Sequence, residues 1–400
     1  MRVIAMSQSI FSIFWRFLVL GCYSFGGPTA HIGYFRREFV EKRQWLSDED
    51  YADTVALCQM LPGPASSQVG MAIGYQQQKL PGAIAAFLGF TLPSALLMIL
   101  LAYGYSLYSD IPVLTSILHG IKIFAVAVVA DALIGMGRNL CPDKARVTMA
   151  LLAAAAMLLL SSVFSQLLVI AVGALAGFLL FQETFQEKVA VTKPVENSKS
   201  TFSAILSLVL FLAWLLLLPV LAGLSDSTSL QLFDSFYRAG ALVFGGGHVV
   251  LPMLQAEVVY DGGVNADAFI AGYSAAQAVP GPMFTLAPFL GGAYGGQFSL
   301  VHALVALAGI FLPSLLLLTA ALPFWNRLKE VPSLKAAIKG INATVVGLLL
   351  AAFYDPVVNL AIRDAKEVAL ALVAFMLLSV WKLPVGLMVL IFGGLGWVLF

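Results

Sequence analysis

The chain has 400 residues, of which 60% are hydrophobic and only 11% are charged, with a mean hydropathy of +0.93 and a formal net charge of +1. This composition excludes a soluble globular protein and indicates an integral membrane protein without a soluble domain. The near-neutral charge argues against a nucleic-acid partner. The three scattered cysteines, Cys22, Cys58 and Cys141, form neither a disulfide framework nor a metal-ligand set.

Apolar segments in the first half alternate with short polar stretches, and we expect them at residues 10–27, 51–75, 82–105, 113–135 and 147–181. The last of these has 35 residues (181 − 147 + 1) and is interrupted by Ser161-Ser162, so it predicts a hairpin of two short helices. Between the first two segments, residues 31–50 are polar and basic. We expect Trp45 in this stretch to anchor at the membrane interface.

The second half begins after a polar segment and an isolated apolar span, and it brings the expected total to about 12–13 apolar segments. Its segments lie at residues 232–250, 269–294, 300–322, 336–353, 368–380 and 383–400. We therefore divide the chain into a first repeat (residues 1–182), a polar linker (183–200), a connecting transmembrane span (201–222) and a second repeat (223–400).

The division depends on a motif that occurs twice. Gln59-Met60-Leu61-Pro62-Gly63-Pro64 returns as Gln277-Ala278-Val279-Pro280-Gly281-Pro282, at an offset of 277 − 59 = 218. Other matches keep nearly the same offset, such as Gly120 with Gly340 at 220. A collinear series of this kind indicates an internal duplication.

The charges of equivalent loops predict that the two repeats have opposite orientations. Residues 31–50 carry Arg36, Arg37, Lys42 and Arg43, whereas residues 252–267 carry no Lys or Arg, so these loops should face opposite sides of the membrane. The predicted fold is an all-α membrane protein with inverted repeats of about six segments each and helices broken at Pro-Gly-Pro. The other basic loops do not all fit a simple crossing count, which leaves open that the Pro-Gly-Pro segments re-enter.

The two breaks are the first candidate for a binding site. Proline removes a backbone donor and clashes with the preceding turn, so Pro-Gly-Pro must interrupt a helix. Interrupted backbone at membrane depth is tolerated where protein or a polar cavity solvates it. A helix that begins after such a break offers backbone N–H groups and about half a positive charge to an anion. The alternative is a purely structural kink.

Charged residues within the apolar segments are few, and we identify Arg16, Lys122 and Asp131. Lys122 is our preferred anion ligand because its repeat counterpart, Asn342, is also polar; the alternative is a lysine that reaches the interface. Asp131 would carry a coupling proton or bind Arg16. His31 and His248 follow the Phe-Gly-Gly motifs and would sense pH or cap a helix break. The candidate substrate-binding residues are Phe25, Gly26, Gly27, Pro28, His31, Gln59, Pro62, Gly63, Pro64, Ser66, Ser67, Lys122, Phe244, Gly245, Gly246, Gly247, His248, Gln277, Pro280, Gly281, Pro282, Thr285 and Asn342.

These motifs together resemble the signature of the chromate ion transporter family in its long, two-domain form. The resemblance rests on Phe25-Gly26-Gly27-Pro28, the two Pro-Gly-Pro breaks and Phe244-Gly245-Gly246-Gly247, where Gly247 replaces the proline of the first copy. It implies a multi-pass protein of the bacterial inner (plasma) membrane that exports chromate from the cytoplasm, with sulfate as a competitor or counter-substrate. It implies no cofactor and no metal, and it leaves a homo-oligomer open.

Two other functions are alternatives to chromate transport. An intramembrane enzyme would need a nucleophile with a base or metal ligands at helical spacing, and the chain contains neither His-Glu-x-x-His nor Gly-x-Ser-x-Gly. A transporter of another solute, such as sulfate, a carboxylate or a neutral molecule, would use the same duplicated architecture. The sequence therefore predicts a transporter and leaves its substrate to the family resemblance.

Overall fold

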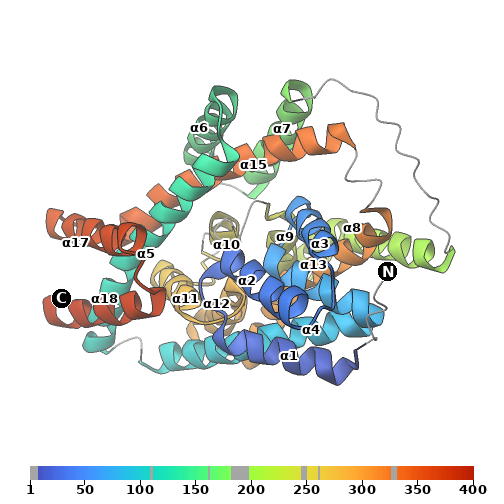
Figure 1. Ribbon diagram of the computed structural model, residues 1–400. Helices are drawn as coiled ribbons and strands as arrows, with labels where there is room; N and C mark the ends of the chain where they lie inside the picture. The colour runs from blue at the N-terminus through green and yellow to red at the C-terminus, as the bar shows by residue number, and fades with distance from the viewer. Residues whose placement is uncertain are drawn as a thin grey trace.

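The computed structural model describes residues 8–108, 111–160, 163–181, 198–244, 250–259, 262–325 and 331–400. Throughout these ranges the regular elements are helices, and none is a strand (Figure 1). This confirms the all-α prediction.

The first half folds into helices that follow the predicted apolar segments. They are α1 (Ile10–Tyr23), α2 (Gly27–Phe35), the π-helical η1 (Arg36–Lys42), α3 (Asp48–Met60), α4 (Ala65–Tyr108), α5 (Pro112–Leu140), α6 (Lys144–Leu159) and α7 (Val163–Leu180). The pair α6 and α7 matches the hairpin predicted for residues 147–181. The isolated span is α8 (Ser198–Gly223).

The second half repeats this order of helices. It contains α9 (Thr228–Leu242), α10 (Val250–Val258), α11 (Ala266–Ala278), η3 (Met283–Thr285), α12 (Leu286–Ala293), η4 (Tyr294–Gly296), α13 (Leu300–Ala321), η5 (Leu322–Phe324), α15 (Pro332–Ala352), η6 (Phe353–Val358), α16 (Asn359–Ala361), α17 (Ala365–Phe375), η7 (Met376–Val380) and α18 (Val385–Leu399). The continuous α4 thus corresponds to η3, α12 and α13.

Equivalent helices begin in the same way in both halves. Ser47 caps α3 by accepting a hydrogen bond from the backbone N–H of Asp50, and Asn265 caps α11 through Ala268 in the same way. Asp143 caps α6, and the backbone N–H and guanidinium of Arg146 hold the pKa of its carboxyl below the usual value. Such caps satisfy N–H groups that have no partner within the helix.

Five helices of the described chain are long and apolar enough to cross a membrane: Ala65–Tyr108, Pro112–Leu140, Thr201–Gly223, Leu300–Phe324 and Pro332–Ala361. Three shorter helices, Ile10–Tyr23, Leu168–Leu180 and Val385–Leu399, are also apolar. Helix α4 spans 44 residues in two helical parts that meet at a kink. It is bent by non-helical backbone at Gln78 and Lys79, near the gap between the predicted segments 51–75 and 82–105.

Each half brings together its first helix and the helix that follows its break. In the first half α1 packs against α4, and in the second half α9 packs against α13. A Cβ added to Gly21 would lie 2.6 Å from the carbonyl oxygen of Phe90, and one added to Gly240 would lie 2.2 Å from that of Ile310. Since 21 + 219 = 240 and 90 + 220 = 310, the two close approaches are equivalent, and glycine permits both.

The last two helices of each half, by contrast, pack on the other half. Figure 1 shows α6 and α7 around α15, and α17 and α18 around α5. Gly340 of α15 lies against Gly173 and Gly177 of α7, and Gly120 of α5 lies against Phe392 and Gly396 of α18. The two repeats are therefore interlocked rather than side by side.

The stretch at residues 31–50 is more buried than its polar composition predicts. Phe35, Phe39 and Trp45 belong to a cluster of buried apolar side chains with Phe17 of α1. The ring of Trp45 lies 4.7 Å from that of Phe39, and the residue is only 7% exposed. The prediction that Trp45 anchors at the interface is therefore wrong, because Phe35, Phe39 and Trp45 point into the core.

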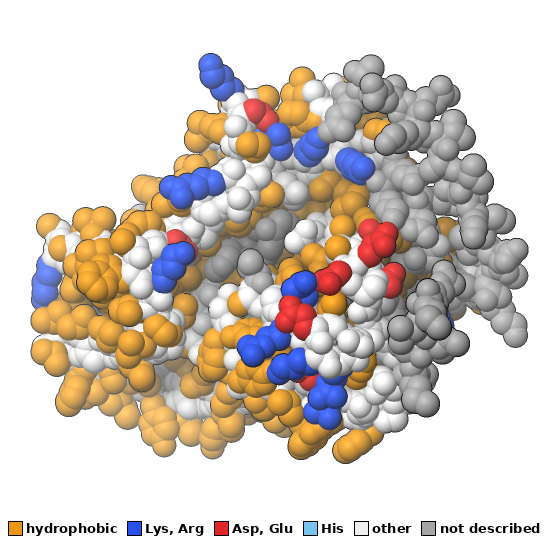
Figure 2. Space-filling model, viewed as in Figure 1, with side chains coloured by type: hydrophobic (Ala, Val, Ile, Leu, Met, Phe, Trp, Pro, Cys, Tyr) orange, Lys and Arg blue, Asp and Glu red, His pale blue; other side chains and the backbone are white. Residues whose placement is uncertain are grey.

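The charged residues of this segment form a patch on one face. Figure 2 shows basic and acidic side chains gathered over α2 and α3, while hydrophobic side chains cover much of the remaining surface. Arg36 bonds to Glu41 and Asp48, and Glu38 bonds to Lys42 and Arg43. The pairs of Arg36 are exposed and contribute little to stability, whereas the side chain of Glu38 is only 13% exposed.

Candidate functional site

The first Pro-Gly-Pro lies between two helices. Helix α3 ends at Met60, Leu61 is extended, and α4 begins at Ala65. Gly63 has a φ of +113°, which strongly favours glycine. The side-chain amide of Gln68 donates to the carbonyl of Pro62 at 2.6 Å, and so satisfies one of the backbone groups that the break releases.

The second break has the same backbone geometry. Helix α11 ends at Ala278, Val279 is extended, and Gly281 has a φ of +101°. Here the hydroxyl of Thr285 donates to the carbonyl of Pro282 at 2.7 Å. Thr285 and Gln68 thus support the two breaks by comparable means with different side chains.

Each break is bound to the opposite repeat by one backbone hydrogen bond. The N–H of Gly63 donates to the carbonyl of Val243 at 2.6 Å, and the N–H of Gly281 donates to that of Ser24 at 2.9 Å. Because 24 + 219 = 243, this is a reciprocal exchange between equivalent positions. Both glycine N–H groups are therefore occupied and differ from the unpaired groups that we expected at the breaks.

A cavity of about 490 Å³ lies beside these breaks. Seven of the predicted site residues line it: Gly26, Gly27, Pro28, Gln59, Gly63, Gln277 and Asn342. They come from both repeats, and the hollow between α5 and the segment formed by α2 and α3 in Figure 2 lies in this part of the molecule. The cavity thus brings together residues up to 385 − 26 = 359 positions apart, from Gly26 to Val385.

Two helix N-termini reach the wall of this cavity. Helix α2 begins at Gly27 after a left-handed Gly26, and α4 begins at Ala65. Gly26, Gly27 and Ala65 all line the cavity. Since the first N–H groups of a helix have no partner within it, these ends present positive potential to the cavity.

The remaining lining residues are one carboxylate and a set of largely apolar side chains. The carboxylate is Asp131, whose Oδ1 accepts a hydrogen bond from Ser379. The others are Ile32, Cys58, Leu61, Val128, Ala132, Met136, Leu140, Leu378 and Val385. Sequence alone gave no reason to select these apolar residues, because nothing distinguishes them from residues that face lipid.

Several predicted site residues lie behind the cavity wall. His31 is fully buried, and its ring nitrogens lie 3.3 Å from the hydroxyl of Ser66 and 3.1 Å from the carbonyl of Ser24. The hydroxyls of Ser24, Ser67 and Ser314 are buried without a hydrogen-bond partner among the described residues. His31 therefore joins the end of α1 to the first turn of α4.

The other candidates have less direct relations to the cavity. Pro62, Pro64, Pro280, Gly281 and Pro282 form the breaks without lining it, Thr285 lies on the second break, Phe25 is 47% exposed, and Phe244 packs against the main core. Gly245, Gly246, Gly247 and His248 fall outside the described residues.

Lys122, predicted as an anion ligand, does not line this cavity. Its ammonium lies 2.5 Å from Oδ1 of Asp267, at the start of α11, and its side chain is only 5% exposed. Its counterpart Asn342 does line the cavity. The two equivalent positions therefore have different surroundings.

Two charged residues within the predicted segment 232–250 were overlooked. Arg238 of α9 bonds to Asp234 at 2.8 Å and to Glu257 of α10 at 2.6 Å, and all three side chains are largely buried. The signal was available, because a charge inside an apolar segment is the criterion that selected Lys122.

Comparison with known proteins identifies the family. The family model described as "Chromate transporter" matches residues 11–178 and again residues 230–397. An uncharacterized transporter of Methanocaldococcus jannaschii is 29% identical over 346 residues, covering 86% of this chain and 84% of that protein. A probable chromate transport protein of Synechococcus elongatus is 28% identical, covering 92% of this chain and 88% of its own.

A chromate transport protein of Cupriavidus metallidurans is 27% identical over 363 residues, covering 90% of this chain and 84% of its own. No solved structure matches the chain significantly. With a family match in each half and several long apolar helices, the chain is a multi-pass membrane protein and a transporter rather than an enzyme. It belongs to the chromate transporter family.

Proposed function

We propose that the protein exports chromate from the bacterial cytoplasm across the inner membrane and binds the anion in the cavity beside the broken helices. The observation that carries this proposal is the meeting of two helix N-termini with three amide side chains, Gln59, Gln277 and Asn342, drawn from both repeats. The chromate transport proteins of Synechococcus and Cupriavidus support the choice of anion.

The electrostatics of the cavity suit a tetrahedral dianion. Each helix N-terminus contributes roughly half a positive charge, so α2 and α4 together offset about one of the two negative charges. Amide N–H groups of Gln59, Gln277 and Asn342 supply donors, and the remaining candidates near the breaks, including Ser67 and Thr285, support the site from behind. Lys122 also belongs to the proposed substrate-binding residues, although it does not line this cavity.

Asp131 opposes an anion in the same cavity unless its carboxylate is neutralised. Its Oδ1 accepts a hydrogen bond from the hydroxyl of Ser379. An ionised carboxylate weakens retention of a dianion, which suits a site that must release what it binds. We therefore assign Asp131 to tuning of affinity and keep proton coupling optional.

Direction follows from the membrane potential. Moving one charge across 100 mV is worth about 2.3 kcal/mol, so a dianion that leaves a negative interior gains about 4.6 kcal/mol per 100 mV. Outward transport then requires no coupled ion. Exchange against sulfate, a tetrahedral dianion, would use the same site and is the second candidate function.

The proposed architecture has inverted repeats, with residues 1–182 and 223–400 as the two units and residues 201–222 as the span between them. The equivalent loops support the inversion because residues 31–50 carry four Lys and Arg residues and residues 252–267 carry none. The reciprocal hydrogen bonds of Gly63 and Gly281 support a two-fold relation between the units.

Counterflow in proteoliposomes tests the proposal. Vesicles preloaded with chromate should accumulate radiolabelled chromate, and Gln59→Ala or Asn342→Ala should raise the half-saturating concentration. Loss of a hydrogen bond to a charged group costs about 1.5–3 kcal/mol, which corresponds to roughly 10- to 100-fold. Gln231→Ala, an exposed amide in α9, is the control and should behave as the wild type. Counterflow with a neutral solute but not with chromate or sulfate would refute the proposal.

A further inference from the structure

At four positions that line the cavity, the described residues of the two repeats differ in burial. Its lining residues Ile32, Ala65, Asp131 and Ala132 are half-buried or exposed. Adding the repeat offset of 218 to 220 gives their counterparts Leu251, Met283, Ala351 and Ala352, which are 0%, 5%, 7% and 3% exposed. At these four described positions the second repeat is therefore packed where the first repeat is open.

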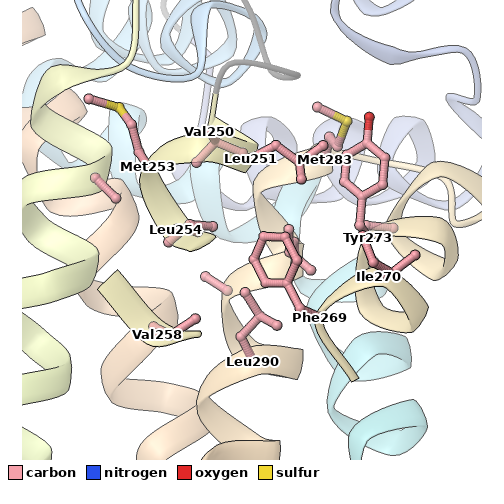
Figure 3. Packing of buried hydrophobic residues seen from close by; sticks show 14 of the residues in the cluster. Val250, Leu251, Met253, Leu254, Val258, Phe269, Ile270, Tyr273, Met283 and Leu290 are labelled. Atoms are coloured by element: carbon pink, nitrogen blue, oxygen red, sulfur yellow. The ribbon is translucent and has the colours of Figure 1, made fainter. Parts of the chain in front are cut away.

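Figure 3 shows how this filling is achieved. Leu251 of α10 and Met283 beside the second break lie close together, above Phe269 and Leu290, within one continuous cluster of buried apolar residues. Helix α11 packs against α5 and α18. No comparable packing joins the equivalent helix α3 to α15 or α7 in the described chain. Helix α11, before the second break, is thus docked on α5 and α18, whereas among the described residues α3, before the first break, is not docked on the equivalent helices α15 and α7.

One ion pair joins α5 to α11 in this docked region. Lys122 of α5 bonds to Asp267 in the first turn of α11, and this pair crosses from one repeat to the other. Counterpart positions on the open side are Asn342 and Glu49 (267 − 218). Asn342 has no charge with which to hold Glu49, which is exposed.

We propose that Lys122 and Asp267 close a second vestibule for tetrahedral anions, and that Lys122 becomes an anion ligand when the pair opens. In the state described here Asn342 faces the open cavity; when α11 leaves α5, the equivalent position in the other repeat is Lys122. The anion then replaces Asp267 as the partner of the ammonium group. This inference deepens the proposed function and rests on it for the choice of an anionic substrate.

Asp267 is well placed for this exchange. Its side chain is 59% exposed, whereas that of Lys122 is 5% exposed. A buried ammonium without a counter-ion is costly at membrane depth. Separation of α11 from α5 therefore requires either water or an anion at Lys122, so the presence of an oxyanion stabilises the opened state.

Cysteine accessibility tests the inference with a matched pair of positions. Ala132 and Ala352 are equivalent (132 + 220 = 352) and carry the same side chain, but only Ala132 lines the cavity. In a chain that keeps the fully buried Cys58 and has Cys22 and Cys141 replaced by alanine, Ala132→Cys should react with a membrane-impermeant maleimide from one side, above the labelling of the parent chain. Ala352→Cys should be protected from both sides.

Breaking the ion pair should reverse this pattern. With Asp267→Asn, labelling of Ala352→Cys should rise about tenfold or more, from the opposite side of the membrane, and labelling of Ala132→Cys should fall. The charge exchange Lys122→Asp with Asp267→Lys should restore the original pattern, which separates the gate from a folding defect. Continued protection of Ala352→Cys in Asp267→Asn, or its labelling from the same side as Ala132→Cys, overturns the proposal.

Anion protection tests the ligand. Chromate, sulfate and phosphate are each added to Asp267→Asn with Ala352→Cys, and the same series is repeated with Lys122→Met. At least one anion should slow labelling in the first variant and none in the second. Protection by sulfate but not by chromate would refute chromate as the substrate and would still support closure by Lys122 and Asp267. Protection by no anion would refute Lys122 as a ligand.

Discussion

Gly63→Ala is the sharpest test of the break, because its cost follows from two features of the structure. The φ of +113° would strain an alanine by about 1–3 kcal/mol. The added methyl would also lie 2.2 Å from the hydroxyl oxygen of Ser314. Among the described residues this hydroxyl has no hydrogen-bond partner to lose when it rotates, so we take the cost of the overlap as about 1 kcal/mol. The expected loss is therefore about 2–4 kcal/mol.

Denaturant titration in mixed micelles measures this loss, and chromate flux in vesicles measures its effect on transport. Gly135→Ala in α5 is the control, because a Cβ there meets nothing within 4 Å; it should leave stability unchanged or raise it by about 0.5–1 kcal/mol. Adding Ser314→Ala to Gly63→Ala should recover the overlap but not the backbone strain. Equal stability of Gly63→Ala and Gly135→Ala would refute the reasoning.

Three further predictions concern the cavity and the packing of the repeats. Asn342→Asp should lower dianion flux by about tenfold or more because a second carboxylate then faces the cavity, and an unchanged flux would remove Asn342 from its wall. Asp131→Asn should retain much of the chromate flux, and flux in everted vesicles should respond to an imposed potential without a pH gradient; strict dependence on a pH gradient would make Asp131 a coupling residue. Gly340→Ala should destabilise the protein by roughly 1–3 kcal/mol, since its Cβ would lie 2.1 Å from the carbonyl oxygen of Gly173. Gly386→Ala, whose Cβ meets nothing, is the control, and equal unfolding curves would contradict the packing described here.

The positions of the helix breaks could be predicted because proline acts locally. Two prolines around a glycine interrupt a helix whatever surrounds them, and α3 and α11 do end before Pro62 and Pro280. The repeat offset also predicted which site residues are equivalent, such as Gln59 and Gln277, because it needs no knowledge of contacts between the halves.

What could not be predicted is the packing between distant segments. Lys122 was selected for its charge, but its partner Asp267 lies 145 residues away in a segment read as a loop. The burial of Phe35, Phe39 and Trp45 was missed because the charged residues between them dominate the composition of the stretch. The exchange of α6 and α7 with α17 and α18 leaves no trace in hydropathy, since both sets are equally apolar wherever they pack.

This exchange determines which parts of the molecule move as units. Because α17 and α18 are seated on α5, and α6 and α7 on α15, any motion that preserves these interfaces carries helices of both repeats together. Each unit that moves as a rigid body then contains helices from both repeats, so the units do not coincide with the two copies of the duplicated sequence. We therefore expect a hinge at the two breaks, where Gly63 and Gly281 bond to the opposite repeat, rather than at the junction of the repeats around α8.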